Sequence, residues 1–217
     1  MNSPTTPVPP LINPLLSKIH HFRRGVIIAT NHQSLDDRLV MRQFFLRSSV
    51  SKCIQMTMPA VWRSFVNNVT GDVDFSPIPS AETLCLWDES VLAIDTFDYL
   101  FVWSGKATLH QKQDKLRRAC ISFLLDKSKQ RFPSPKLHVL IEGDPMSRKV
   151  TTRLAPSHGN TREEQLANFP DLAMLSPDRL NSLRSKFRLY DPESDSTFLH
   201  WLSKIAETDS GGETLCC

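Results

Sequence analysis

The sequence lacks the features by which metal sites, membrane spans and nucleic-acid-binding chains are most easily recognised. None of its five cysteines forms a Cys-x-x-Cys pair, and no Cys/His cluster has the spacing of zinc ligands. No apolar run approaches the length of about 18 residues that indicates a membrane-spanning helix. The net charge of +3 is too small to favour nucleic-acid binding or a strongly basic membrane patch.

The first residues, MNSPTTPVPP, also lack the charged-then-apolar profile of a signal peptide. Without paired spacings, the cysteines are typical of reduced thiols in a cytosolic protein. The terminal pair, Cys216 and Cys217, could be a lipidation site as in some prenylated proteins, although no polybasic segment precedes it.

The composition, in contrast, is that of a chain that folds around a core. Of its 217 residues, 40% are hydrophobic and 23% are charged, which allows one ordinary domain plus a smaller segment. Ser90 to Trp103 is dense in β-branched and aromatic residues and predicts one long strand or two short ones. Asp114 to Lys129 has apolar residues at helical spacing and predicts an amphipathic helix.

The stretch from Arg131 to Gly159 organises the second half of the chain. Its two apolar runs predict strands at 136–141 and 150–154, joined by an exposed loop, with Arg148 near the start of the second strand. Before it, Ser34 is expected to cap a helix. The segment 67–79 is rich in polar and turn-forming residues, which predicts a loop, and 160–181 is polar with two prolines, which predicts a long loop with a helical turn. A sheet with a helix packed on each side fits this order of elements.

One motif resembles the catalytic motif of glycerolipid acyltransferases. His32 and Asp37 have the spacing His-x-x-x-x-Asp, in which the histidine acts as general base on a hydroxyl and the aspartate orients it. Glu142 and Gly143 could stand for the later Pro-Glu-Gly motif of that family. The alternative is a polar loop whose Ser34 or Asp36 caps the following helix. Such a protein would transfer an acyl chain to a lysophospholipid, and it is the alternative function.

A second resemblance covers nearly the whole chain, in several blocks that occur in the right order. The blocks are His21–Arg24, Asn31–Asp37, Arg42–Phe65, Leu92–Phe97 with Trp103–Gly105, Gln130–Lys136, Ser147–Arg148 with Leu154–Ser157, and Asp191–Ala206. Together they resemble the C-terminal part of the Sec23 family of protein transport proteins, the inner-coat GTPase-activating subunit of COPII vesicles.

This resemblance implies an α+β fold with a gelsolin-like domain, a central mixed sheet with flanking helices. The implied division is a flexible Pro-rich N-terminus (1–13), a partial helical domain (14–58), one or two strands and a loop of an incomplete β-sandwich (59–83), the gelsolin-like domain (84–207) and a disordered tail (208–217). The zinc finger and trunk of the family are absent, so no cofactor is expected, because the family's zinc site lies in one of those domains.

The resemblance also implies a function. The family activates the Sar small GTPase, and the arginine finger of its gelsolin-like domain aligns with Arg148. A guanidinium supplied in trans suits the charge that develops on the phosphoryl oxygens. A solvated surface arginine is the alternative. The implied protein is a GTPase activator rather than an enzyme, with Sar and other COPII subunits as partners. It would be cytoplasmic, peripheral on the endoplasmic reticulum membrane and COPII vesicles, in transport from endoplasmic reticulum to Golgi.

Overall fold

We describe the chain from a computed structural model, which covers residues 13–25, 27–28, 34–108, 112–157, 161–186 and 201–202. Three helices, α1 (Asn13–Arg24), α2 (Leu35–Arg47) and α3 (Val50–Thr57), precede the strands. The strands are β1 (Ala60–Val66), β2 (Val73–Ile78), β3 (Val91–Asp95), β4 (Tyr99–Ser104) and β5 (Lys136–Ile141). The later helices are α4 (Lys112–Ser128), α5 (Arg148–Thr151), α6 (Arg162–Asn168) and α7 (Pro177–Lys186). Short 3₁₀ turns are η1 (Thr83–Cys85), η2 (Lys106–Thr108), η3 (Pro145–Ser147) and η4 (Pro170–Met174).

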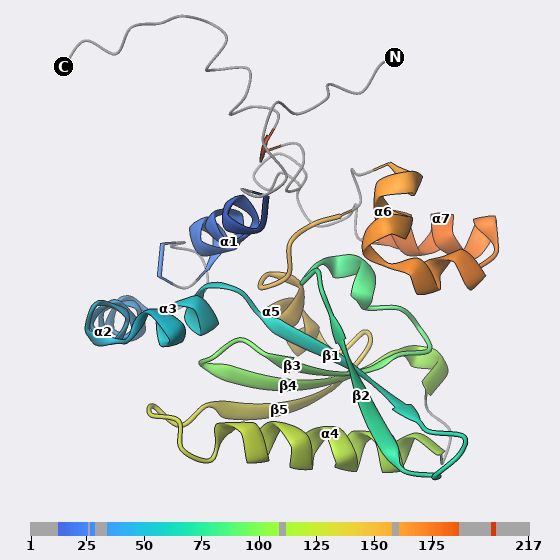
Figure 1. The fold of residues 1–217 in the computed structure, drawn as a ribbon, viewed down its shortest axis with the longest axis horizontal. Helices are drawn as coiled ribbons and strands as arrows, with labels where there is room; N and C mark the ends of the chain where they lie inside the picture. Colours follow the sequence, from blue (N-terminus) through green and yellow to red (C-terminus); the bar gives the residue numbers. More distant parts are fainter. Residues whose placement is uncertain are drawn as a thin grey trace, which may run out of the picture.

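The strands form a single sheet in the order β2-β1-β3-β4-β5 (Figure 1). The pairs from β2 to β4 are antiparallel, and β5 is parallel to β4. The parallel pair requires a crossover, and α4 supplies it. The α+β class expected from the sequence, with a central mixed sheet and flanking helices, is therefore confirmed.

The central strands β3 and β4 are buried on both faces of the sheet. One face packs on α4 through a cluster of Val91, Ala93, Leu100, Val102, Cys120 and Leu124. The other face packs on the segments around α5 and α7 through a larger cluster that includes Leu92, Phe101, Trp103, Val150, Leu154 and Leu180. In the view of Figure 1, α4 runs below the sheet while α6 and α7 lie above it. Strands covered on both faces read as continuous apolar runs, which explains the density of Ser90 to Trp103.

The three N-terminal helices are attached to the sheet through its β3–β4 turn. Phe97 in this turn is 2% exposed and packs with Ile27, Met41 and Met56. Arg131 donates two hydrogen bonds to the Asp95 carboxylate, at 2.6 and 2.7 Å, and its guanidinium lies 5.1 Å from the Phe97 ring centroid. The Phe97 side chain in this turn therefore links the helical segment to the sheet.

Several local expectations are confirmed. The Ser90 to Trp103 run is two strands, β3 and β4, and the predicted helix is α4. Ser34 caps α2, because its hydroxyl accepts the backbone N–H of Asp37 at 3.2 Å. The 136–141 strand is β5.

Both loop predictions are wrong in part. Residues 73–78 form the edge strand β2, which tolerates Pro77 because an edge position leaves one side of the strand without ladder bonds. The 160–181 segment, predicted as a long loop with a helical turn, holds α6, η4 and the first half of α7. Its prolines, Pro170 and Pro177, are the first residues of η4 and α7. Proline is favoured at a first helical position because its missing N–H has no intrahelical partner there.

The predicted strand at 150–154 is also wrong, since α5 occupies Arg148–Thr151. Val150 and Leu154 are both fully buried, and a spacing of four residues fits one face of a helix as well as one face of a strand. The expected division also places residues 59–83 in a β-sandwich of their own, whereas β1 and β2 continue the sheet of β3. The other domain boundaries stay predictions.

Candidate functional site

The turn after β5 carries Arg148, and local hydrogen bonds hold its backbone. Gly143 adopts a positive φ of 92°, which lets the chain reverse directly after the strand. The Asp144 N–H donates to the carbonyl of Ile141 at 2.9 Å, and the Asp144 carboxylate accepts the N–H of Met146 at 2.7 Å. With Pro145 opening η3, the turn is capped and braced.

Arg148 is the first residue of α5, and the buried residues on either side fix where it emerges. Val150 is fully buried, and the half-buried Met146 packs against the same core. The Thr152 hydroxyl donates to the carbonyl of Arg148 at 2.8 Å. The Arg148 side chain itself is exposed, and among the described residues it forms no ion pair or hydrogen bond. A guanidinium without partners on a braced backbone is available to an external anion.

Two cations, Lys149 and Lys136, lie near this turn. Lys149 places its Nζ 5.3 Å from the centroid of the Tyr99 ring. His138 on β5 contacts the rings of Tyr99 and Phe101, with centroid distances of 5.5 and 5.7 Å. Burial, together with the charges of Lys149 and Lys136, lowers the pKa of His138.

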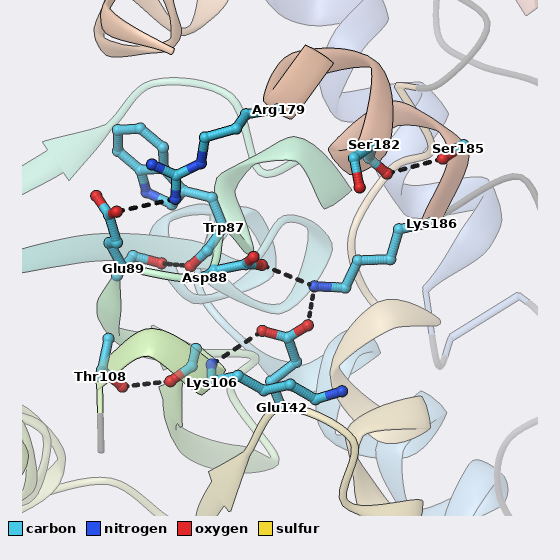
Figure 2. Close-up of polar contacts among 12 residues, drawn as sticks. Trp87, Asp88, Glu89, Lys106, Thr108, Glu142, Arg179, Ser182, Ser185 and Lys186 are labelled. Carbon is cyan, nitrogen blue, oxygen red and sulfur yellow. Dashed lines mark hydrogen bonds and ion pairs between the residues drawn. The ribbon is translucent and has the colours of Figure 1, made fainter. Parts of the chain in front are cut away.

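A cleft of about 380 Å³ opens beside the end of β5, but its charges neutralise one another (Figure 2). The Glu142 carboxylate accepts the backbone N–H of Lys106 at 3.0 Å and forms an ion pair with Lys186 of α7. Lys186 also lies 3.3 Å from a carboxylate oxygen of Asp88. These ion pairs attach α7 to the sheet, so the charged groups of the cleft have a structural role rather than a catalytic one.

The described residues of the acyltransferase motif are not gathered into a site. His32 lies outside the described residues. Asp37 completes the cap of α2, because its carboxylate accepts the Ser34 hydroxyl at 2.8 Å. Glu142 is held against α7, and α2 and α7 lie on opposite sides of the molecule in Figure 1. Asp37 and Glu142 therefore do not share a pocket, and the capping role of Ser34 explains the motif.

Among the described residues, no group of three or more His, Cys, Asp or Glu side chains is placed to hold a metal ion. Cys53, Cys85 and Cys120 are free thiols. Burial raises the pKa of the Cys120 thiol to about 11 and also raises that of Cys85, so neither is a ready thiolate nucleophile at neutral pH. Cys216 and Cys217 lie outside the described residues. Within the described ranges, no helix has both the length and the apolar composition needed to cross a membrane.

Sequence reasoning missed the ion pairs that join distant segments. Arg131 reaches Asp95 across 36 positions, and Lys186 reaches Glu142 across 44, so no local pattern signals either pair. Two blocks of the Sec23 resemblance meet in the first pair. Two others meet where Arg24 donates to the carbonyl of Leu154 at 2.9 Å. The blocks that carry the resemblance are therefore joined in space as well as aligned in order.

The fold and the turn together define an α+β module with a mixed sheet whose edge strand leads into a braced, arginine-bearing turn. The sequence is similar to the protein transport protein SEC23 A of Arabidopsis thaliana, with 26% identity over 199 residues. This match covers 91% of the chain and 22% of that protein, so the chain spans about a fifth of the length of this relative. The resemblance expected from the sequence is confirmed. No protein-family model matches.

Among solved structures, the human COPII-coat protein Sec24c is similar, with a TM-score of 0.54 and 16% identity. That match covers 83% of this chain and 25% of Sec24c, and it indicates a shared fold. The Thorarchaeota 2DGel3/rabbit actin complex matches 43% of the chain with a TM-score of 0.36, which is too low to indicate a shared fold.

Proposed function

We propose that this chain acts as a COPII-type coat subunit, or a part of one, in protein transport. The similarity to SEC23 A over 91% of the chain supports this role, and the fold it shares with Sec24c is consistent with it. Its partners would be other coat subunits. Its place would be cytoplasmic and peripheral on the endoplasmic reticulum membrane and its vesicles, which is the location that the Sec23 resemblance implies.

We further propose that the chain activates a Sar-type small GTPase through Arg148, as a GTPase-activating protein rather than an enzyme in itself. The observation that carries this proposal is the exposed, unpaired guanidinium of Arg148 on a backbone anchored by the fully buried Val150. Anchoring matters because a catalytic group that is already positioned loses little conformational entropy when the reaction occurs.

The chemistry follows from the guanidinium. GTP hydrolysis builds negative charge on the phosphoryl oxygens and the leaving group, and a planar, permanently charged fork neutralises it from outside the GTPase. Such a residue contributes about 10³–10⁵ in rate when supplied in trans. The ammonium of a lysine has the charge but lacks the fork, so it would substitute poorly.

The test compares three variants in single-turnover GTP hydrolysis by a Sar-type GTPase, with binding of each variant to the GTPase measured separately. Arg148→Ala is expected to lose about 10³-fold or more of the stimulation while binding is retained, and Arg148→Lys to recover little. Lys149→Ala is the matched control, because Lys149 is an equally exposed neighbouring cation, and it should keep the stimulation. Equal stimulation by the unchanged chain and Arg148→Ala would refute the proposal. The proposal would also be refuted if the unchanged chain bound the GTPase without stimulating GTP hydrolysis.

A further inference from the structure

The outer edge of β5 is an open strand edge. β5 is the last strand in the sheet order. Its Lys136 N–H donates to the carbonyl of Asp98, and the N–H of Glu142, which follows the strand, donates to that of Ser104. In a parallel pair of strands, the backbone N–H and C=O groups of every second residue point to the same neighbouring strand. The even-numbered residues of β5 therefore form the hydrogen bonds to β4. The backbone groups that face away from β4 are those of Leu137, Val139 and Ile141.

Little else in the described part of the chain covers this edge. The carbonyl of Ile141 accepts from Asp144 and from the Ser147 hydroxyl. Within the described ranges, no hydrogen bond reaches the N–H and C=O groups of Leu137 and Val139 from outside the β4 ladder. Val139 and Ile141 are also 48% and 38% exposed. The edge therefore offers both unpaired backbone groups and apolar side chains.

The opposite edge of the sheet is different. β2 contains Pro77, which has no N–H, and the charged Asp74. Prolines and charges on an edge strand prevent another strand from adding to it. No residue between Leu137 and Ile141 has either property. An edge left without these protections is a place where another strand can add.

The charges around the β5 edge select an acidic partner. Exposed cations stand at both ends, Lys136 at the start of the strand and Arg148 and Lys149 after it. Two acidic groups next to the strand are paired within the chain, since Asp98 binds Arg153 at 2.7 Å and Glu142 forms an ion pair with Lys186. A second copy of this chain would bring one set of cations against another, because antiparallel pairing of two β5 edges places unlike ends together and both ends are basic.

We propose that an extended, acidic segment of a partner protein adds to β5 as a sixth strand. Its main chain pairs with Leu137 and Val139, its β-branched side chains cover Val139 and Ile141, and its acidic ends face Lys136 and Lys149. This is recognition by strand addition, in which the main chain supplies affinity and the side chains supply specificity. The proposal stands apart from the proposed function, because it requires no contact of Arg148 with a nucleotide.

The test uses the full chain and a synthetic peptide, acetyl-Glu-Asp-Val-Thr-Val-Thr-Glu-Asp-amide, with the amide exchange rates of β5 followed by NMR. In the free chain, the amides of Leu137 and Val139 should exchange faster than those of His138 and Leu140, which bond β4. Peptide binding should slow the two outward amides and leave the inward ones unchanged. A peptide with lysines in place of the acidic residues should bind about tenfold or more weakly.

Two variants separate edge pairing from general binding. Val139→Pro removes an outward N–H without removing a bond to β4, and it should weaken binding about tenfold. Val139→Thr keeps the N–H and should bind as the unchanged chain does. Lys136→Glu with Lys149→Glu leaves the strand intact and should also weaken binding about tenfold, which keeps the test valid if Val139→Pro unfolds. The proposal fails if the outward amides stay unprotected, if charge reversal changes nothing, or if the chain dimerises through β5 instead.

Discussion

The β3–β4 turn places Phe97 in a conformation that only glycine adopts freely, and this predicts an unusual order of stability among variants. Phe97 has a φ of +72° and is 2% exposed. Truncating a buried phenylalanine to alanine costs about 3–5 kcal/mol. Against a total of about 5–15 kcal/mol for an ordinary domain, Phe97→Ala should remove a large share of the free energy of unfolding.

Phe97→Gly removes the same ring and should nevertheless be the more stable of the two. Within a helix or strand, a glycine variant is usually less stable than the alanine variant by about 0.5–1 kcal/mol, because the flexible glycine backbone loses more entropy on folding. At a positive φ the Cβ of alanine clashes with the backbone, which costs about 1–2 kcal/mol, and the usual order reverses. We expect Phe97→Gly to exceed Phe97→Ala by about 1 kcal/mol.

The assay is equilibrium urea unfolding of both variants, followed by circular dichroism and tryptophan fluorescence, with amide exchange in α1 to α3 as a second readout. Phe97 contacts Phe44, with 5.7 Å between ring centroids, and packs on Met41 and Met56. Amide exchange in these helices should therefore accelerate in both variants while β3 and β4 stay protected. An alanine variant as stable as the glycine variant would refute the strain argument. Unchanged exchange in the helices would refute the role of Phe97 as their attachment.

Two further predictions concern buried charges. Arg131→Ala leaves the Asp95 carboxylate, 10% exposed, without its bidentate partner, and should lower the free energy of unfolding measured in urea by about 3 kcal/mol. Adding Asp95→Asn should recover a measurable part of the lost stability, and no recovery would contradict the pairing. Burial raises the pKa of Glu82 above its ordinary 4.5, so its contribution to stability is present below pH 4.5 and is lost as pH rises through the folded-state pKa. Glu82→Gln keeps the oxygen that accepts from Asn168 at 3.2 Å, so at pH 8 it should unfold at a higher temperature than the unchanged chain. Its unfolding temperature should also vary less with pH above pH 4.5. An unchanged dependence of the unfolding temperature on pH would contradict the burial argument.

Much of the fold could be predicted from the sequence where the signal was local. The strands β3 and β4 followed from a run dense in β-branched and aromatic residues, although this run left open whether it forms one strand or two. The cap at Ser34 followed from its position before an apolar run. The failures share a cause. Pro170, Pro177 and Pro77 indicated loops, but a proline also starts a helix and is tolerated in an edge strand, and only the neighbours in space distinguish these cases.

The candidate site was predicted less completely. The resemblance singled out Arg148, but it could not show that the residue begins a helix, nor that Asp144 and Thr152 brace its backbone. The acyltransferase motif illustrates the opposite case. His32 and Asp37 have a suggestive spacing, yet the hydroxyl of Ser34 already engages the Asp37 carboxylate, and no local pattern shows which partner a carboxylate takes.

By itself, the sequence determined the alternation of strands and helices, the apolar runs that fill the core and the likeness to Sec23, because periodicity and residue order are properties of the chain. The tertiary structure alone decided which strand lies at an edge, which charges are neutralised and which remain free. Glu142 and Arg148 are six positions apart in the chain and each carries one full charge, of opposite sign, but Lys186 forms an ion pair with Glu142 while no described side chain pairs with Arg148. Whether a charged side chain has a partner nearby in the fold, rather than its residue type, decides whether it has a structural role or is available for chemistry.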